Sequence, residues 1–360
     1  MAFSRRSMLA AVLHSARDLR LERVAVPSRK PDEVLVQVTL NGLCGSDIHF
    51  YTEGELGPFK VTTPYTPGHE ACGVVVEAAS TGRGPQVGQR VAIEPGIPCR
   101  HCELCKSGRY NLCPDVVFMS APPVDGTFAE FVTLAADFAH VVPDCVDDES
   151  AAFVEPISVG IQACRRAHVT AGHTVVVLGA GPIGLVTMLV ARVFGATSVY
   201  AVDVLENRVD LARQLGANAA IDARATDPVE AIAELTRGRG TDIVFDTSGS
   251  AAACQTTPHL ARRGGVVTIV GWPSPGILPY SIEMVLEKEL DVRGVNRYAN
   301  TYPTAIALLA SGKLDVHPLI SHRFPFDRVV EAFEFSADHR AETIKVMIGG
   351  RPSGADQPAR

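Results

Sequence analysis

The chain has 360 residues, a length that suggests two domains, each able to bury a hydrophobic core of its own. Its formal net charge of −7 at pH 7, with no block of basic residues, argues against nucleic acid or an anionic membrane as the main partner. No apolar run approaches the roughly 20 residues that a membrane-spanning helix needs.

The first residues faintly resemble an export signal, because a pair of arginines precedes an apolar run. That run is short for a signal, and His14 interrupts it. We therefore interpret residues 9–27 as a hairpin of two short strands, and we expect a cytoplasmic protein.

Residues 1–158 are expected to form a β-rich domain. Strand-like runs alternate there with loops rich in Gly and Pro, and helical periodicity is almost absent. The runs lie at 34–40, 73–78, 90–93 and 128–134. Residues 299–360 are expected to complete this domain, with helices at 302–309 and 329–335 and a strand at 343–348.

Four cysteines in the β-rich domain predict a structural zinc site. They are Cys99, Cys102, Cys105 and Cys113. Four thiolates within fifteen residues leave no position open for water or substrate, which is typical of a closed tetrahedral site. Disulfides are the alternative, and a cytoplasmic location disfavours them. His101 lies inside the loop and is expected to be a bystander.

The stretch from 174 to 203 predicts a dinucleotide-binding unit. An apolar strand leads into a glycine-rich turn, a helix and a second strand that ends on an acid; the residues are Gly179, Gly181, Pro182, Ile183, Gly184 and Asp203. Gly179 permits the tight turn, Gly181 lets backbone N–H groups approach a pyrophosphate, and Gly184 lets helix and strand pack closely. Pro182 suits the first helical turn, and Asp203 is placed to accept the hydroxyls of the adenosine ribose.

Residues 159–298 are expected to form a Rossmann domain, a doubly wound parallel sheet of the α/β class. A helix at 155–168 leads into it. After Asp203 the alternation continues with helices at 207–215, 228–236 and 251–261 and strands at 219–221, 242–246, 265–270 and 291–295.

A second, dispersed group of possible metal ligands lies in the β-rich domain. Cys44, the pair His69-Glu70 and Glu155 each have an ordinary explanation, as a core cysteine, a capped histidine and a helix-starting acid. A mixed set of sulfur, nitrogen and oxygen donors suits a catalytic zinc, which needs an open position. Spacing alone does not join these residues into one site.

Seven motifs identify a family resemblance. They are Cys44-Gly-Ser-Asp-Ile-His49, Pro67-Gly-His-Glu-Ala71, Gly108-Arg-Tyr-Asn-Leu-Cys-Pro114, Val154-Glu-Pro-Ile-Ser-Val-Gly160, Gly179-Ala-Gly-Pro-Ile-Gly184, Arg297-Tyr-Ala-Asn300 and His322-Arg-Phe-Pro325. Together they resemble the zinc-dependent medium-chain dehydrogenase/reductase superfamily, and most closely its polyol branch of sorbitol and xylitol dehydrogenases. The resemblance implies a GroES-like catalytic domain and a Rossmann NAD-binding domain.

The resemblance also implies a catalytic zinc held by Cys44, His69 and Glu70. Glu155 would be a fourth ligand, directly or through water. Ser46 would hydrogen-bond the reacting hydroxyl and start a proton relay to His49. With the four-cysteine site, two zinc ions per chain are expected.

Substrate and cofactor contacts follow from the same resemblance. The expected substrate contacts are Tyr51, Phe118, Glu155, Arg297 and Tyr298. Besides the glycine-rich turn and Asp203, the expected NAD contacts are Arg208, Val270 and Arg297. Asp203 favours NAD over NADP, because a carboxylate repels a 2′-phosphate.

The expected function is zinc- and NAD-dependent oxidation of a secondary hydroxyl of a sugar alcohol to the ketose, by a homo-oligomer that is a tetramer by resemblance. Three alternatives remain open. The substrate is another secondary alcohol, such as threonine, butanediol or a cyclitol; the chain is a non-catalytic or zinc-free NAD(P)H-binding relative; or the four cysteines belong to a nucleic-acid-binding module, which the acidic charge disfavours.

Overall fold

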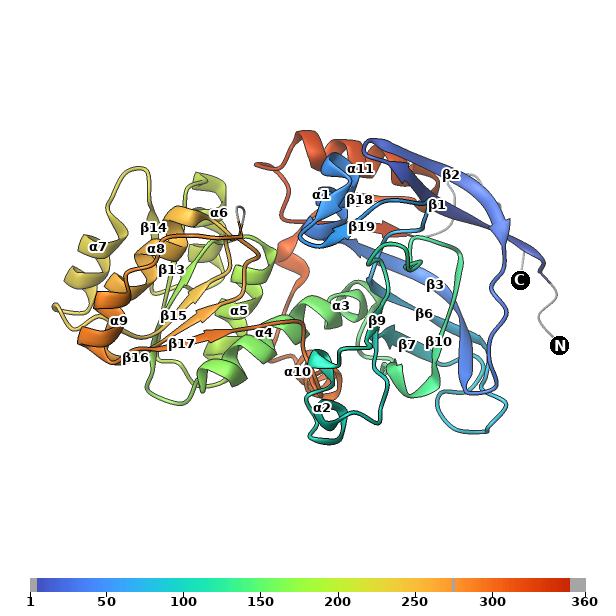
Figure 1. Cartoon of the computed structure of the whole chain (residues 1–360), viewed down its shortest axis with the longest axis horizontal. Helices are drawn as coiled ribbons and strands as arrows, with labels where there is room; N and C mark the ends of the chain where they lie inside the picture. Colours follow the sequence, from blue (N-terminus) through green and yellow to red (C-terminus); the bar gives the residue numbers. More distant parts are fainter. Residues whose placement is uncertain (1–4, 274–275, 350–360) are drawn as a thin grey trace. The chain divides into compact units, whose positions relative to one another are not determined.

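The computed structural model describes residues 5–273 and 276–349, which fold into two compact units (Figure 1). The first unit contains Met1–Glu155 and Tyr302–Arg360, and the second contains Pro156–Thr301. Within the described ranges, no helix combines the length and the apolar character that crossing a membrane requires.

The first unit is built on a seven-stranded sheet. Its order is β11 (Ala139–Val141), β7 (Arg90–Ile93), β6 (Glu70–Glu77), β3 (Glu33–Leu43), β19 (Lys345–Gly349) and β18 (Ile320–Phe324), with β10 (Phe131–Ala135) also paired to β3. The C-terminal strand β19 pairs antiparallel with β3, so the end of the chain completes the sheet that its beginning starts.

Among its described residues, this unit also contains three two-stranded ribbons. They are β1 (Ser7–Ser15) with β2 (Asp18–Ala25), β4 (Glu55–Leu56) with β5 (Phe59–Lys60), and β8 (Gly96–Ile97) with β9 (Val117–Phe118). The first of these is the expected hairpin, drawn in dark blue in Figure 1.

Helices in the first unit are short, and the sequence patterns missed several of them. The unit contains α1 (Gly45–Glu53), α2 (Glu103–Lys106), α3 (Asp148–Ala152), α10 (Tyr302–Ala310) and α11 (Val329–Asp338). The expectation of almost no helix before residue 155 is wrong for α1. Only four of its residues are buried, and one of them is the acid Asp47, so the apolar periodicity of α1 is weak.

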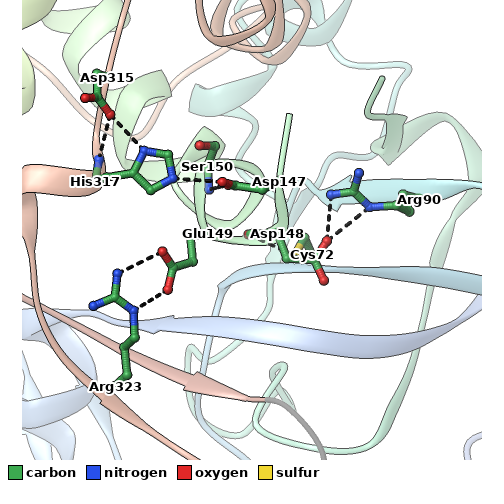
Figure 2. A network of polar contacts seen from close by, with 9 residues as sticks. All are labelled: Cys72, Arg90, Asp147, Asp148, Glu149, Ser150, Asp315, His317 and Arg323. Atoms are coloured by element: carbon green, nitrogen blue, oxygen red, sulfur yellow. Dashed lines mark hydrogen bonds and ion pairs between the residues drawn. The ribbon is translucent and has the colours of Figure 1, made fainter. Parts of the chain in front are cut away.

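Charged contacts fix α3 to three other elements of the first unit (Figure 2). Arg90 of β7 donates to Asp148, and Arg323 of β18 forms a two-bond pair with Glu149. His317, in the short 3₁₀ turn η3 (His317–Leu319), lies 2.8 Å from Asp147, the N-cap of α3.

The second unit is a six-stranded parallel sheet flanked by helices. Its strand order is β14 (Ala219–Asp222), β13 (Ser198–Asp203), β12 (Thr174–Leu178), β15 (Thr241–Asp246), β16 (Ala261–Ile269) and β17 (Asp291–Gly294). The helices are α4 (Val154–Ala167), which contains the boundary between the units, and α5 (Pro182–Val193), α6 (Glu206–Gln214), α7 (Pro228–Leu235), α8 (Ala251–Leu260) and α9 (Ile282–Lys288).

This order confirms the predicted doubly wound sheet. The chain runs outward from β12 to β14 on one side and from β15 to β17 on the other, so the direction of winding reverses between β12 and β15. In such sheets a dinucleotide binds at the carboxyl ends of the strands beside this switch point. The short helix α9 was not predicted.

Candidate functional site

Three of the expected metal ligands lie together in the first unit. The ligand atoms of Cys44, His69 and Glu70 are all within 4.8 Å of one another. Cys44 is the N-cap residue of α1, directly after β3. His69 directly precedes β6, whose first residue is Glu70. Because β3 and β6 are neighbouring strands, the ladder places the three residues side by side.

A buried acid that sequence reasoning did not single out supports this group. Asp47, one turn into α1, is fully buried and accepts hydrogen bonds from Cys44 N (3.2 Å), Gly68 N (3.2 Å) and Ser120 Oγ (2.7 Å). His69 Nδ1 lies 3.6 Å from Asp47 Oδ1. A carboxylate behind a histidine fixes the orientation of the ring and is the usual partner of a metal-bound imidazole.

Burial alone would raise the pKa of the Asp47 carboxyl, but the nearby charge of His69 and the hydrogen bonds from Ser120 and the Cys44 N–H outweigh burial. The pKa of Asp47 is therefore below its ordinary value, and this acid remains ionised at neutral pH. The sequence signal for Asp47 is its place inside the motif that runs from Cys44 to His49.

The described residues fit a zinc ion at Cys44, His69 and Glu70. Glu70 Oε1 is buried and has no hydrogen-bond partner within residues 5–273 and 276–349, while Oε2 accepts a hydrogen bond from Lys345 Nζ at 2.5 Å. A buried carboxylate oxygen without a partner costs free energy unless a cation balances it. One thiolate, one imidazole and one carboxylate give a zinc three protein ligands and leave a further position open.

Ser46 and His49 lie on one side of α1, because residues three apart on a helix are neighbours. Both side chains are partly exposed, whereas Asp47 and Ile48 between them are buried. His49 Nδ1 lies 2.9 Å from Glu53 Oε1, one turn further along the helix. The side chains of Ser46, His49 and Glu53 therefore follow each other along α1, away from Cys44.

The remaining expected residues of the first unit have different positions. Phe118 lies beside the metal-ligand group, with its ring centroid 5.7 Å from that of His69. Glu155 is buried at the start of α4 and does not join the group whose ligand atoms lie within 4.8 Å. Tyr51 packs edge-to-face on Phe333 in the hydrophobic core. This placement does not support a substrate role for Tyr51.

The four cysteines of the loop 99–113 form a second group, with ligand atoms within 4.8 Å of one another. The sulfurs of Cys99 and Cys105 are 3.9 Å apart, and those of Cys102 and Cys105 are 3.4 Å apart. Disulfide sulfurs are only about 2 Å apart. Tetrahedral zinc with bonds of about 2.3 Å places its sulfurs about 3.8 Å apart, so the geometry fits a closed zinc site.

Backbone N–H groups of His101 and Cys102 lower the pKa of Cys99 to about 6, which favours the thiolate that a metal requires. The imidazole of His101 is exposed and lies 2.8 Å from the carbonyl of Cys99, and His101 does not join the four sulfurs. Its expected role as a bystander agrees with this position.

The glycine-rich turn lies at the carboxyl end of β12 in the second unit. Gly179 has φ +91°, and a side chain there would meet Ser248 at 2.9 Å. A side chain on Gly184 would collide with the carbonyl of Gly179. Gly181 differs, because an added Cβ would meet only Arg208, at 3.8 Å. The space over Gly181 is therefore open on its side-chain face, as a bound pyrophosphate requires.

Asp203 ends β13 and its carboxylate already binds the protein backbone. Oδ2 accepts the N–H of Ala180 at 2.6 Å, and Oδ1 accepts those of Val204 and Leu205 at 2.8 and 2.9 Å. A carboxylate offers about four lone-pair positions, so the three backbone bonds leave Asp203 room for a further hydrogen bond. Arg208 lies 4.0 Å from Asp203, next to the open face of Gly181.

Three further expected contacts belong to the second unit. Val270 directly follows β16 and donates its N–H to Asp246 O at 2.8 Å. Arg297 and Tyr298 follow β17; Arg297 has φ +54° and Tyr298 is buried. Burial lowers the pKa of Arg297, which remains charged because its ordinary value is so high.

The structure thus combines a GroES-like unit that gathers two sets of metal ligands with a Rossmann unit that presents a phosphate-binding turn. Two family models match these parts. Residues 30–144 match the alcohol dehydrogenase GroES-like domain, and residues 182–311 match the zinc-binding dehydrogenase model. Fold and ligand groups together define a zinc-binding alcohol dehydrogenase.

Curated relatives extend this match over nearly the whole chain. Sorbitol dehydrogenase of Bacillus subtilis (strain 168) is 40% identical over 342 residues, covering 95% of this chain and 97% of the relative. Sorbitol dehydrogenase of Homo sapiens is 40% identical over 348 residues, covering 96% of each chain. The chain belongs to the zinc-dependent medium-chain dehydrogenase/reductase family and is an oxidoreductase.

Solved structures agree with this assignment. L-idonate 5-dehydrogenase from Escherichia coli K-12 matches with a TM-score of 0.89 and 30% identity, over 96% of this chain and 98% of that one. A zinc-binding dehydrogenase of Sinorhizobium meliloti holding NADP has a TM-score of 0.89 and 33% identity, and covers 96% of this chain and 100% of its own. An E. coli CFT073 dehydrogenase holding NADH has a TM-score of 0.88 and 27% identity, with the same coverage. The enzyme uses zinc and a nicotinamide cofactor.

Proposed function

We propose that this enzyme oxidises a secondary hydroxyl of an open-chain sugar alcohol to the ketose, with NAD as hydride acceptor. The observation that carries the proposal is the group of Cys44, His69 and Glu70, in which a buried carboxylate oxygen has no hydrogen-bond partner among the described residues. Relatives named as sorbitol dehydrogenases, and the fold shared with an idonate dehydrogenase, support a polyhydroxy substrate.

We assign two zinc ions to each chain, one to each ligand group. The group with three ligands would hold the catalytic ion, and the four cysteines would hold a structural one. When bound, zinc supplies a Lewis acid that lowers the pKa of the reacting hydroxyl, and NAD supplies the hydride acceptor.

The chain's own residues would position the substrate and carry its proton away. The Ser46 hydroxyl would accept the proton of the reacting hydroxyl while its own proton moves on toward His49, and His49 would release a proton to solvent from the partly exposed face of α1. Glu53 orients the His49 ring through their 2.9 Å contact. Phe118, against His69, excludes water from one side of the metal ligands.

Glu155 and Arg297 are the groups that favour a polyol over a simple alcohol. Hydrogen bonds to charged side chains are stronger than those between neutral groups, and a polyol offers more hydroxyls for such bonds than a simple alcohol does. We assign Glu155 and Arg297 to the hydroxyls that flank the reacting carbon.

We also propose a homo-oligomer, a tetramer by family resemblance. Large apolar side chains of the second unit are exposed, namely Trp272, Ile277, Ile282, Leu286 and Val292. Val292 lies on β17, an edge strand, and exposed apolar groups beside a free sheet edge favour pairing with another copy. Sedimentation of the zinc-loaded enzyme tests this assignment, and a monomer at micromolar concentration would refute it.

The catalytic assignment is tested by Cys44→Ser. We expect turnover of sorbitol or xylitol to fall by at least about 10³-fold, because one of three ligands of the Lewis acid is lost, with circular dichroism unchanged. Retention of most of the activity would show that this ligand group is not the catalytic centre.

A further inference from the structure

A buried lysine lies against the candidate catalytic metal site. Lys345, the first residue of β19, is only 2% exposed, and lysine is almost never fully buried unless it is paired. Its Nζ donates to Glu70 Oε2 at 2.5 Å and to the Leu43 carbonyl at 3.4 Å. Glu70 is itself only 1% exposed, so water does not screen this pair.

Sheet geometry shows how the two side chains meet. Glu70 is on β6 and Lys345 is on β19, and β3 runs between these strands. On β3, the residue opposite Glu70 is Gly42. A Cβ at Gly42 would collide with Glu70 Oε2, so this position leaves the space in which the carboxylate turns toward Lys345.

The two oxygens of the Glu70 carboxylate serve different cations, the Lys345 ammonium group and the proposed zinc ion. Oε2 binds the ammonium group, whereas Oε1, in the group formed with Cys44 and His69, is buried and has no hydrogen-bond partner in the part of the chain that the structure describes. A carboxylate that shares its charge with an ammonium group donates less to a metal. A positive charge a few ångströms away also repels the metal directly.

We propose that Lys345 is a positioning residue of the metal centre, which draws charge from the Glu70 carboxylate and thereby keeps the catalytic zinc weakly held and strongly Lewis acidic. The inference rests on the proposed function, since it takes Cys44, His69 and Glu70 as the catalytic zinc ligands. Ligands and hydrogen-bonded groups behind them tune the affinity and acidity of a metal in this way.

The test is the rate at which the zinc-loaded enzyme loses zinc to an excess of chelator. The release phase of the catalytic ion is the one that disappears in Cys44→Ser. We expect Lys345→Gln to slow this phase by about tenfold or more, because the amide still donates to Glu70 Oε2 but carries no charge. Lys345→Arg keeps the charge, so its release rate should stay within about threefold of wild type.

The direction in which the zinc-release rate changes distinguishes this role from a purely structural one. If Lys345 only held Glu70 in place, its loss would speed zinc release, and that result would overturn the proposal. Slow release from Lys345→Arg would also overturn it, so the test stands even if Lys345→Gln does not fold. Lys288→Gln is the matched control, because Lys288 donates only to backbone carbonyls of the second unit in the described contacts; its release rate should equal wild type.

Failure of the proposed function has a different signature. If no release phase disappears in Cys44→Ser, the ligand assignment is wrong and the role of Lys345 is wrong with it. If the phase exists but Lys345→Gln leaves it unchanged, the ligand assignment stands and only the role of Lys345 is overturned.

Discussion

Asp203 is the residue on which the proposed preference for NAD depends. Three backbone N–H groups fix its carboxylate at the end of β13, so the negative charge is held in place beside the glycine-rich turn. A fixed anion at this position repels the 2′-phosphate of NADP. Arg208 Nη1 lies 4.0 Å from the same carboxylate.

The first prediction is that Asp203→Ser reduces the ratio of kcat/KM for NAD to that for NADP by about 10- to 100-fold, since the repulsion is lost together with a ribose contact. Steady-state rates with both cofactors measure the ratio. Asp222→Ser is the matched control, because Asp222 ends the neighbouring strand β14 and pairs with Arg224 at the surface. A wild-type enzyme whose kcat/KM for NADP equals its kcat/KM for NAD would contradict the assignment.

The second prediction concerns Arg297. Arg297→Ala should lower kcat/KM for sorbitol or xylitol by roughly 10- to 100-fold, about 1.4 to 2.8 kcal/mol, the range for losing one or two charge-assisted hydrogen bonds. The effect on 2-butanol should be far smaller. Arg293→Ala is the control, because Arg293 lies on β17, just before Arg297, and pairs with Asp291 of the same strand. Equal losses on polyol and simple alcohol would assign Arg297 to the cofactor or the fold.

At the scale of elements, the N-terminus of α3 is held by an ion pair that depends on pH (Figure 2). Partial burial alone would lower the pKa of His317, but hydrogen bonds to Asp315 and Asp147 raise it above its ordinary value. Asp147 also accepts the Ser150 N–H at 2.8 Å, as the N-cap of α3. A histidine whose pKa is raised by folding stabilises the protein below its unfolded pKa of about 6.5, and this contribution disappears as pH rises through the higher folded value.

The third prediction follows from this pH dependence of the contribution of His317 to stability. His317→Ala should destabilise the first unit by about 0.5 kcal/mol at pH 6 and by almost nothing at pH 9, because the pair is partly exposed. Urea unfolding of both proteins at the two pH values measures the difference. A destabilisation that is the same at both values would show that the charge of His317 does not contribute.

The four-cysteine loop is the element whose metal should act on stability and not on chemistry. It is anchored to the sheet of its unit by Tyr110, whose hydroxyl donates to buried Glu94 at 2.7 Å, and Glu94 also contacts His140. Loss of the metal would therefore disturb the sheet as well as the loop.

The fourth prediction is that Cys102→Ser lowers the melting temperature by roughly 5–10 °C. A domain of this size shifts by about 2–4 °C per kcal/mol, so this range corresponds to a loss of about 2.5 kcal/mol of folding free energy. Calorimetry of the zinc-loaded proteins measures the shift. Cys145→Ser is the matched control, because Cys145 is an exposed cysteine outside both ligand groups, and it should melt like wild type. An unchanged melting temperature in Cys102→Ser would remove the structural role.

At the scale of the whole molecule, the sequence was sufficient for the parts that repeat a local pattern. Alternation of apolar strands and helices predicted the Rossmann sheet. The strand near residue 345, which was expected to return to the first unit, pairs there with β3. Helix α1 could not be predicted in the same way, because its buried face includes Asp47 and is stabilised by contacts with residues distant in sequence, Gly68 and Ser120.

The candidate site shows the same limit. The four cysteines are close in sequence and could be grouped from spacing, whereas Cys44, His69 and Glu70 were joined only through family resemblance. Lys345 was missed because its partner Glu70 is 275 residues away, although a single lysine in an apolar strand is itself a signal of a buried partner. The burial of Tyr51 in the hydrophobic core could not be predicted, because sequence does not show which face of a short helix is buried.

The central claim is that this zinc- and nicotinamide-dependent enzyme acts on open-chain polyols. The most direct measurement is a set of initial rates of NADH formation with sorbitol, xylitol, arabinitol, threonine, 2,3-butanediol and 2-butanol, for the zinc-loaded enzyme and for the same enzyme after chelation. We expect kcat/KM for at least one polyol to exceed that for every other alcohol by tenfold or more (about 1.4 kcal/mol), a ketose as product, and loss of the rate after chelation. An enzyme that ignores every polyol and oxidises threonine or butanediol, or that keeps its rate without zinc, would contradict the claim.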